Sequence, residues 1–199
     1  MIKDLILASA STARARLLEG AGLKVRVEPS GLDEAAIKQT FREKGCRALG
    51  CALALAEAKA RWVADRHDHL LVIGADQILV CGDVWFDKPW DLEAARIQLK
   101  ALRGRTHELV TAVCVVQAGT LLWHIVSRPQ LAMRVFSDEF LDDYIAAEGA
   151  GILGSVGAYR LEGRGVQLFE HIEGDHFAIL GLPLLELLGF LRDCGELAS

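Results

Sequence analysis

The chain has 199 residues, of which 52% are apolar, and a formal net charge of −5 at pH 7. This length and composition suffice for a sizeable core, so we expect one α/β domain over residues 1–199. A general nucleic-acid surface is not expected, because it would require clustered lysines and arginines. A small anionic ligand held by a few local cations is compatible with this charge.

The cysteines are odd in number, at five, and no two of them form a CxxC pair. Free thiols in a reducing compartment are therefore expected, and zinc ligation is not. The apolar stretch at the N-terminus is too short for a signal peptide, and no run reaches the roughly 20 apolar residues of a membrane span. We expect a soluble, cytoplasmic protein without membrane contacts.

The first predicted unit is a strand, a serine-rich turn and a helix. Residues 5–8 are apolar, Ser9 and Ser11 follow them, and a helical pattern with Arg14 continues to a glycine stop. Such a turn directs backbone N–H groups and hydroxyls to one place in front of an arginine, which suits a phosphate. N-capping by either serine, with a solvated arginine, explains the pattern equally well.

A second strand is predicted over residues 25–28, and helical patterns follow over residues 34–44 and 47–64. Glu34 stands at a helix start, where the helix dipole alone explains an acidic residue. Lys59 falls on the apolar face of the next helix. Snorkelling to the edge is the common explanation, but an inward ammonium can also neutralise a buried carboxylate.

The stretch LLVIGADQILV at residues 70–80 predicts a buried strand, with Asp76 and Gln77 at or near its carboxyl end. An ionised carboxylate out of water is costly unless it is paired or binds a metal, so Asp76 needs a cation or belongs to a site. The alternative is a surface turn at these two residues. It is disfavoured because apolar residues resume directly at Ile78.

The second half of the chain predicts alternating short elements. In chain order they are a return strand after a turn at residues 81–84, a helix from residue 90 or 91, a polar turn at 103–107, a hairpin of 108–117 and 121–127, a strand at 130–136, a helix from Ser137 to Gly149, a mobile segment at 149–157, a hairpin over 158–172 and a helix from Leu182 to Cys194. Pro89 keeps Lys88 extended in front of the first of these helices.

Together these segments supply two possible metal-binding carboxylates, Glu34 and Asp76, two lysines, Lys59 and Lys88, and a hydroxyl-rich turn backed by Arg14. Carboxylates bind a hard divalent cation such as magnesium, and cations with backbone donors bind polyphosphate. Hydrolysis of a nucleotide anhydride needs both, together with a carboxylate that accepts a proton from the attacking water. By spacing alone, a sugar-phosphate enzyme fits these residues as well.

The ordered motifs resemble the Maf nucleotide pyrophosphatases over nearly the whole chain. The opening LILASASTARARLL is similar to the family's apolar strand, Ser-x-Ser, arginine and paired leucines. Further matches, in order, are Asp33-Glu34, the helix around Lys59, Ala75-Asp76-Gln77, Lys88-Pro89, Gly-Arg-Thr-His at 104–107 leading to Thr111, Gly157-Ala158-Tyr159, Glu173-Gly174-Asp175 and Gly181-Leu182-Pro183. The acidic residue and lysine that the family has before Gly-x-Tyr are absent here.

The resemblance implies an α/β fold in which a mixed central sheet is flanked by helices, with two lobes around a cleft as in inosine triphosphate pyrophosphatases. It also implies a house-cleaning hydrolysis of nucleoside triphosphates to monophosphate and pyrophosphate with Mg²⁺ or Mn²⁺. The implied residue roles are proton acceptance by Asp76, metal binding by Glu34 and Asp76, and phosphate contacts by Lys59, Lys88, Ser9, Ser11 and Arg14.

In the family, the residues at three positions vary with the base that the enzyme prefers. In this chain, these positions are occupied by Ala13, Gln77 and Glu162. Gln77 and Glu162 resemble the residues of the branch that acts on 7-methyl-GTP. A physical reason supports this resemblance, since a carboxylate can accept from the donor edge of guanine and favours its cationic methylated ring. Ala13 differs from that branch and from the dTTP and UTP branch. The resemblance also leaves a second function open, a nucleotide-binding regulator of septum formation with little turnover, and it permits a homodimer.

Overall fold

The structure is a computed structural model that describes residues 5–198. The chain divides into two compact units. The first comprises the residues up to Gln77, Val110–Ser127 and the residues from Asp175 onward, and the second comprises Ile78–Leu109 and Arg128–Gly174. Within residues 5–198, no helix combines the length and the apolar character that a membrane span requires.

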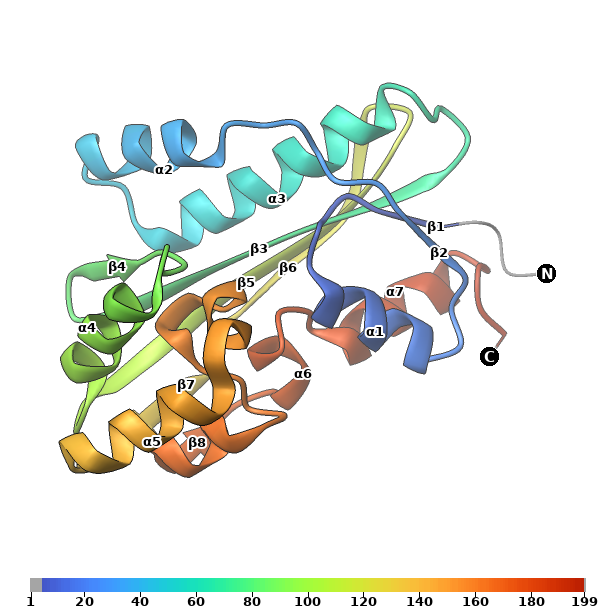
Figure 1. Cartoon of the computed structure of the whole chain (residues 1–199). Helices are drawn as coiled ribbons and strands as arrows, with labels where there is room; N and C mark the ends of the chain where they lie inside the picture. Colours follow the sequence, from blue (N-terminus) through green and yellow to red (C-terminus); the bar gives the residue numbers. More distant parts are fainter. Residues whose placement is uncertain (1–4, 199) are drawn as a thin grey trace. The chain divides into compact units, whose positions relative to one another are not determined.

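The first unit is built on parallel strands that carry helices on both sides. Its strands are β1 (Leu5–Leu7), β2 (Val25–Val27), β6 (Thr120–Ser127) and parts of β3 (Leu71–Cys81) and β5 (Thr106–Gln117); its helices are α1 (Thr12–Gly20), α2 (Glu34–Glu43), α3 (Ala48–Ala64), α6 (His176–Ile179) and α7 (Leu184–Asp193). β1 lies between β2 and β3 and is parallel to both, whereas β6 is antiparallel to β5. Figure 1 shows α2 and α3 on one side of these strands and α1 and α7 on the other.

One face of these strands forms an apolar core with α1 and α7. Alternate residues of β3, including Leu71 and Ile73, pack there with Leu18 of α1 and Leu187 of α7. The opposite face of β3 contacts α3 so closely that a Cβ on Gly74 would lie 2.0 Å from the carbonyl oxygen of Ala56. Gly74 is therefore required for the contact between strand and helix, because only a residue without a side chain fits there.

The second unit contains the remaining elements. They are β4 (Val84–Phe86), α4 (Leu92–Leu102), β7 (Gln130–Met133), α5 (Asp138–Glu148), the 3₁₀ helices η1 (Gly149–Gly154), η2 (Val156–Ala158) and η3 (Arg164–Leu168), and β8 (Phe169–Glu173). The strand order is β2-β1-β3-β5-β7-β8, with β4 beside β3 and β6 beside β5. Because the sheet contains parallel and antiparallel pairs and carries helices, the predicted mixed α/β fold is confirmed.

Three local predictions for the second half were wrong. The expected polar turn at 103–107 ends early, because β5 begins at Thr106 and includes the buried His107. The expected strand at 130–136 ends at Met133. The hairpin over 158–172 does not form, because the chain folds so tightly on itself that a Cβ on Gly165 would lie 2.4 Å from the carbonyl oxygen of Arg160. Only β8 is extended in that stretch, and it pairs with β7.

Candidate active site

The carboxyl end of β1 places two serines next to the start of α1. Ser11 is the N-cap of α1, and its hydroxyl accepts from the backbone N–H of Arg14 at 3.4 Å. The hydroxyl of Ser9 is buried and accepts from Nη1 of Arg14 at 3.0 Å. The capping interpretation is therefore confirmed for Ser11, whereas Ser9 is held by the arginine.

Arg14 is buried and not solvated. Its Nε donates to the carbonyl oxygen of Gly181 at 2.8 Å, and its Nη1 donates to that of Ala75 at 2.8 Å. Burial lowers the pKa of the guanidinium, and the charges of Asp76 and Glu34 partly oppose this change. The residue that was predicted to contact phosphate thus also joins α1 to β3 and to the segment before α7.

The central feature of the site is a lysine between two carboxylates. Nζ of Lys59 in α3 lies 2.7 Å from Oδ1 of Asp76 and 2.8 Å from Oε2 of Glu34. The side chains of Lys59 and Asp76 are each 6% exposed, whereas that of Glu34 is 45% exposed. The prediction that an inward-facing Lys59 supplies the cation for Asp76 is confirmed.

Asp76 does not lie near the carboxyl end of its own strand, as the sequence had indicated. It stands in the middle of β3, because the apolar residues after Gln77 continue the strand and pair with β4. The neighbouring β1, however, pairs with β3 only as far as Ile73. Asp76 therefore lies beyond the carboxyl end of the parallel strand β1, which is where open α/β sheets bind ligands.

Glu34 reaches the site from the first turn of α2. Asp33 caps this helix, since its Oδ1 accepts from the backbone N–H of Ala36 at 3.0 Å. The acidic residue at the helix start therefore has a role beyond the helix dipole, because its side chain is paired with Lys59.

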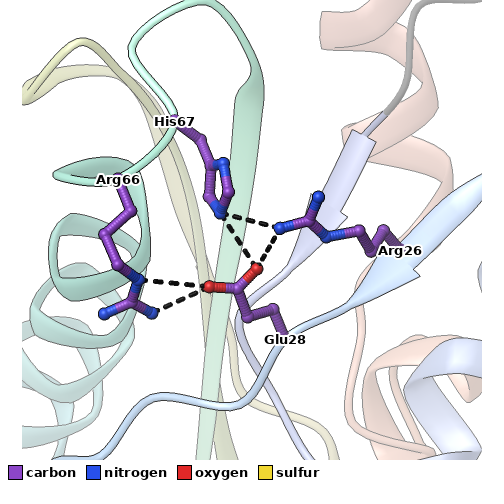
Figure 2. Close-up of polar contacts among 4 residues, drawn as sticks. All are labelled: Arg26, Glu28, Arg66 and His67. Atoms are coloured by element: carbon purple, nitrogen blue, oxygen red, sulfur yellow. Dashed lines mark hydrogen bonds and ion pairs between the residues drawn. The ribbon is translucent and has the colours of Figure 1, made fainter.

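The loop that leads to Glu34 is fastened at its beginning by an ion cluster (Figure 2). Oε1 of Glu28 accepts from Nη2 of Arg66 at 2.8 Å, and Oε2 contacts Arg26 and, at 2.9 Å, Nε2 of His67. Hydrogen bonds from Arg26 and then from Arg66 lower the pKa of Glu28 to about 2. The guanidinium of Arg66 also lies 3.8 Å from the ring centre of Trp62. Sequence reasoning missed this cluster, which ties the end of β2 to the end of α3.

Gln77 points to the opposite face of β3 from Asp76, as alternation along a strand requires. Its Nε2 donates to Oγ1 of Thr111 at 2.8 Å and to the carbonyl oxygens of Ala178 at 3.0 Å and Ile179 at 3.2 Å. Ala13, another predicted specificity residue, is half-buried in the first turn of α1. One face of β3 thus holds the ion pair of Asp76 with Lys59, and the other face holds the hydrogen-bonded amide of Gln77.

Two predicted site residues belong to the second unit. Lys88 is exposed between β4 and α4, and the exposed Glu162 lies between η2 and η3, where its Oε1 is 3.5 Å from Nε of Arg160. The first unit brings together Ser9, Arg14, Glu34, Lys59 and Asp76. That Lys88 and Glu162 contribute to the same site stays a prediction.

The sequence profile described as Maf-like protein matches residues 4–194, so the chain belongs to the Maf family. The chain is 54% identical over 188 residues to a nucleoside triphosphate pyrophosphatase of Granulibacter bethesdensis, covering 94% of this chain and 95% of that protein. It is 50% identical over 199 residues to the protein of the same name from Rhodospirillum rubrum, covering 100% and 98%. It is 46% identical over 197 residues to a 7-methyl-GTP pyrophosphatase of Mesorhizobium japonicum, covering 99% of each.

A solved structure was also found, that of a nucleoside-triphosphatase (dITP/XTP pyrophosphatase) from Mycobacterium abscessus. It matches with a TM-score of 0.41 and 13% identity over 96% of this chain and 98% of that one.

Proposed function

We propose that the chain is a nucleoside triphosphate pyrophosphatase that adds water across the α–β anhydride and yields monophosphate and pyrophosphate. The names of its relatives in the Maf family support this activity. The single structural observation that carries the proposal is the buried pair of Lys59 and Asp76 with Glu34 beside it. Buried ionisable groups that interact beyond the carboxyl end of a neighbouring parallel strand, here β1, are typical of active sites.

The two oxygens of Asp76 differ in a way that suits a general base. Oδ1 is fixed by Lys59, whereas Oδ2 is buried and has no hydrogen-bond partner within residues 5–198. A buried acceptor without a partner is costly, so Oδ2 is suited to receive a proton from water. In the proposed step, the water oxygen bonds to the α-phosphorus, Asp76 takes the proton, and the α–β bridging oxygen leaves with pyrophosphate.

The acidic side chains fit a divalent cation that arrives with the triphosphate. Within residues 5–198, no group of three or more His, Cys, Asp or Glu side chains is placed to hold a metal ion. Magnesium does not need such a group, because it typically binds one or two carboxylates together with substrate phosphates and water. Glu34, whose side chain is 45% exposed, and Asp76 are the residues that would hold Mg²⁺ or Mn²⁺. The ion would neutralise charge on the phosphate oxygens.

The chain's own cations have separate roles in this proposal. Lys59 pairs with Asp76 and holds it in place, and Lys88 stabilises the charge that develops on pyrophosphate. Ser9, Ser11 and Arg14 contribute phosphate contacts at the start of α1. We place the activity in the cytoplasm, because within residues 5–198 no disulfide joins the five cysteines, which suits a reducing compartment.

We propose 7-methyl-GTP as the preferred substrate, with dTTP or UTP as the alternative. Glu162 would accept from the donor edge of the base, and its charge would favour the cationic methylated ring. Ala13 lacks the side chain that both branches of the family carry. A panel of 7-methylguanosine, uridine, thymidine and cytidine triphosphates tests this preference, and an unchanged order of substrates in Glu162→Gln would refute the role of Glu162.

Pyrophosphate release in the presence of Mg²⁺ tests the activity itself. In water labelled with ¹⁸O, the label should enter the monophosphate and not the pyrophosphate. Asp76→Asn should abolish turnover while circular dichroism stays unchanged, and Asp83→Asn, at an exposed turn residue, should leave the rate unaltered. Tight nucleotide binding without release of pyrophosphate would instead support the regulatory function.

A further inference from the structure

Thr111 is a polar side chain without exposed surface in the middle of β5. Its Oγ1 donates to the carbonyl oxygen of Ala178 at 2.9 Å, and this bond uses the single proton of the hydroxyl. In its other bond, at 2.8 Å, Oγ1 must therefore accept, and the donor is Nε2 of Gln77. The hydroxyl thus links Gln77 to α6 through two bonds of defined direction.

These surroundings allow only one orientation of the Gln77 amide. Besides Thr111, Nε2 contacts the carbonyl oxygens of Ala178 and Ile179, which can only accept hydrogen bonds. A flipped amide would place Oε1 against two carbonyl oxygens, so the chemistry of the partners fixes the assignment. Nε2 consequently faces α6, and Oε1 faces away from it.

The carbonyl groups that hold Gln77 are themselves fixed by a cap. Asp175 accepts from the backbone N–H groups of Phe177 at 3.1 Å and of Ala178 at 2.8 Å. A helix of four residues has no stability of its own, so α6 depends on this cap and on the bond from Thr111. The hydrogen bonds among Gln77, Thr111 and α6 therefore require one orientation of the Gln77 amide, which apolar packing alone would not require.

We propose that Thr111 is a positioning residue for substrate selection: it holds Gln77 so that residue 77 presents only an acceptor, which binds a hydrogen-bond donor of the nucleotide. This inference rests on the proposed function and deepens it. Thr111 is completely buried and does not touch the substrate itself. Its effect is transmitted through the orientation of Oε1 of Gln77.

The first test is the side-chain amide of Gln77, observed by NMR in the intact protein. Its protons should exchange slowly with solvent in the wild type and in Thr111→Ser, which keeps the hydroxyl. In Thr111→Val, which keeps the shape and loses the hydroxyl, they should exchange at least about tenfold faster. Fast exchange in the wild type, or equal exchange in the serine and valine variants, would overturn the positioning role.

The second test is a double-mutant cycle of Thr111→Val and Gln77→Ala, measured as kcat/KM for GTP, 7-methyl-GTP, UTP, dTTP and CTP. Thr111→Val should reduce the preference for the best over the worst substrate by about tenfold, and Thr111→Ser should restore it. In the Gln77→Ala background, Thr111→Val should change the preference no further. Equal losses for all nucleotides, or additive changes in the double variant, would show a structural role and refute the inference.

The two hypotheses fail in different ways. If the wild type hydrolyses none of these nucleotides, the proposed function is wrong, and the link to substrate selection is lost with it. If the wild type is active but its preference does not respond to Thr111→Val, the proposed function stands and only the role of Thr111 is refuted.

Discussion

The ammonium of Lys59 lies 2.7 Å from Oδ1 of Asp76, and both side chains are almost completely buried. Removing one partner of such a pair leaves an uncompensated charge in the interior. The two partners are not equivalent, however, because Lys59 has Glu34 as a second carboxylate. The cost of a substitution should therefore depend on which partner is lost.

Lys59→Met should lower the free energy of unfolding by about 3–5 kcal/mol, because it leaves the buried carboxylate of Asp76 unpaired. Asp76→Asn should cost less, since Lys59 keeps Glu34. The double variant Lys59→Met/Asp76→Asn should regain part of the stability lost in Lys59→Met while remaining inactive. Urea unfolding at pH 7 measures all three. Equal costs for the two single variants would show that Glu34 does not compensate Lys59.

Gly74→Ala should strongly destabilise the protein, because a Cβ would lie 2.0 Å from the carbonyl oxygen of Ala56 and 2.8 Å from Cβ of Ala60. Displacing α3 from β3 should cost about 3 kcal/mol or more and should also separate Lys59 from Asp76. Gly20→Ala in α1 is the matched control, since a Cβ there meets nothing within 4 Å. Thermal unfolding should show a large loss for the first variant and none for the second.

His107 should make stability fall as the pH falls from 6.5 to 4. Burial lowers its pKa to about 4, from an ordinary value of 6.5, so the unfolded chain binds the proton first. The loss should reach about 3 kcal/mol near pH 4 and should level off as the pH falls below it. His107→Gln should flatten the pH dependence of urea unfolding between pH 6.5 and 5, above the range in which most carboxylates titrate. An unchanged slope would contradict this assignment.

Glu28 should contribute to stability at neutral pH and lose this contribution in acid. Its pKa in the folded protein is about 2, below the ordinary value of 4.5, so the contribution is complete above pH 4.5 and disappears as the pH falls towards 2. Glu28→Gln should lower the melting temperature at pH 7, with a smaller difference from wild type at pH 3. Glu170→Gln, at an exposed residue of β8, serves as the control and should change neither value.

Two of the five thiols should react with a thiol reagent in the native protein. Cys46 and Cys194 are exposed, whereas Cys51, Cys81 and Cys114 are buried. Burial also raises the pKa of Cys114 to about 12, which removes its reactive thiolate at neutral pH. Absorbance titration should count two thiols in buffer and five in concentrated urea. Five rapidly reacting thiols in buffer would show that the core opens readily.

Local sequence patterns predicted the elements that carry the candidate site. Asp76 was identified as a carboxylate inside an apolar strand, and Lys59 as a lysine on an apolar helix face, because both break a periodic pattern. A helix start after the two serines was predicted, and of these Ser11 caps α1. A helix start at Glu34 was also predicted, whereas its cap, Asp33, was not.

Contacts between distant segments could not be predicted in the same way. Arg14 and its partner Gly181 are 167 residues apart in the sequence, and Glu28 and its partner Arg66 are 38 residues apart. The helix α6 was missed because four residues are too short for a helical period to be visible. The incorrect hairpin at 158–172 arose because glycines that suggest a turn between strands here permit a tight 3₁₀ path.

Because side chains alternate along β3, the adjacent residues Asp76 and Gln77 lie in separate environments. A substitution of Gln77 changes contacts with Thr111 and α6, whereas a substitution of Asp76 changes contacts with α3, so each can be altered without repacking the other. An insertion or deletion of a single residue earlier in β3 would have a different result, because it would reverse the direction of every later side chain. The carboxylate would then face the carbonyl groups of α6, and the amide would face the lysine.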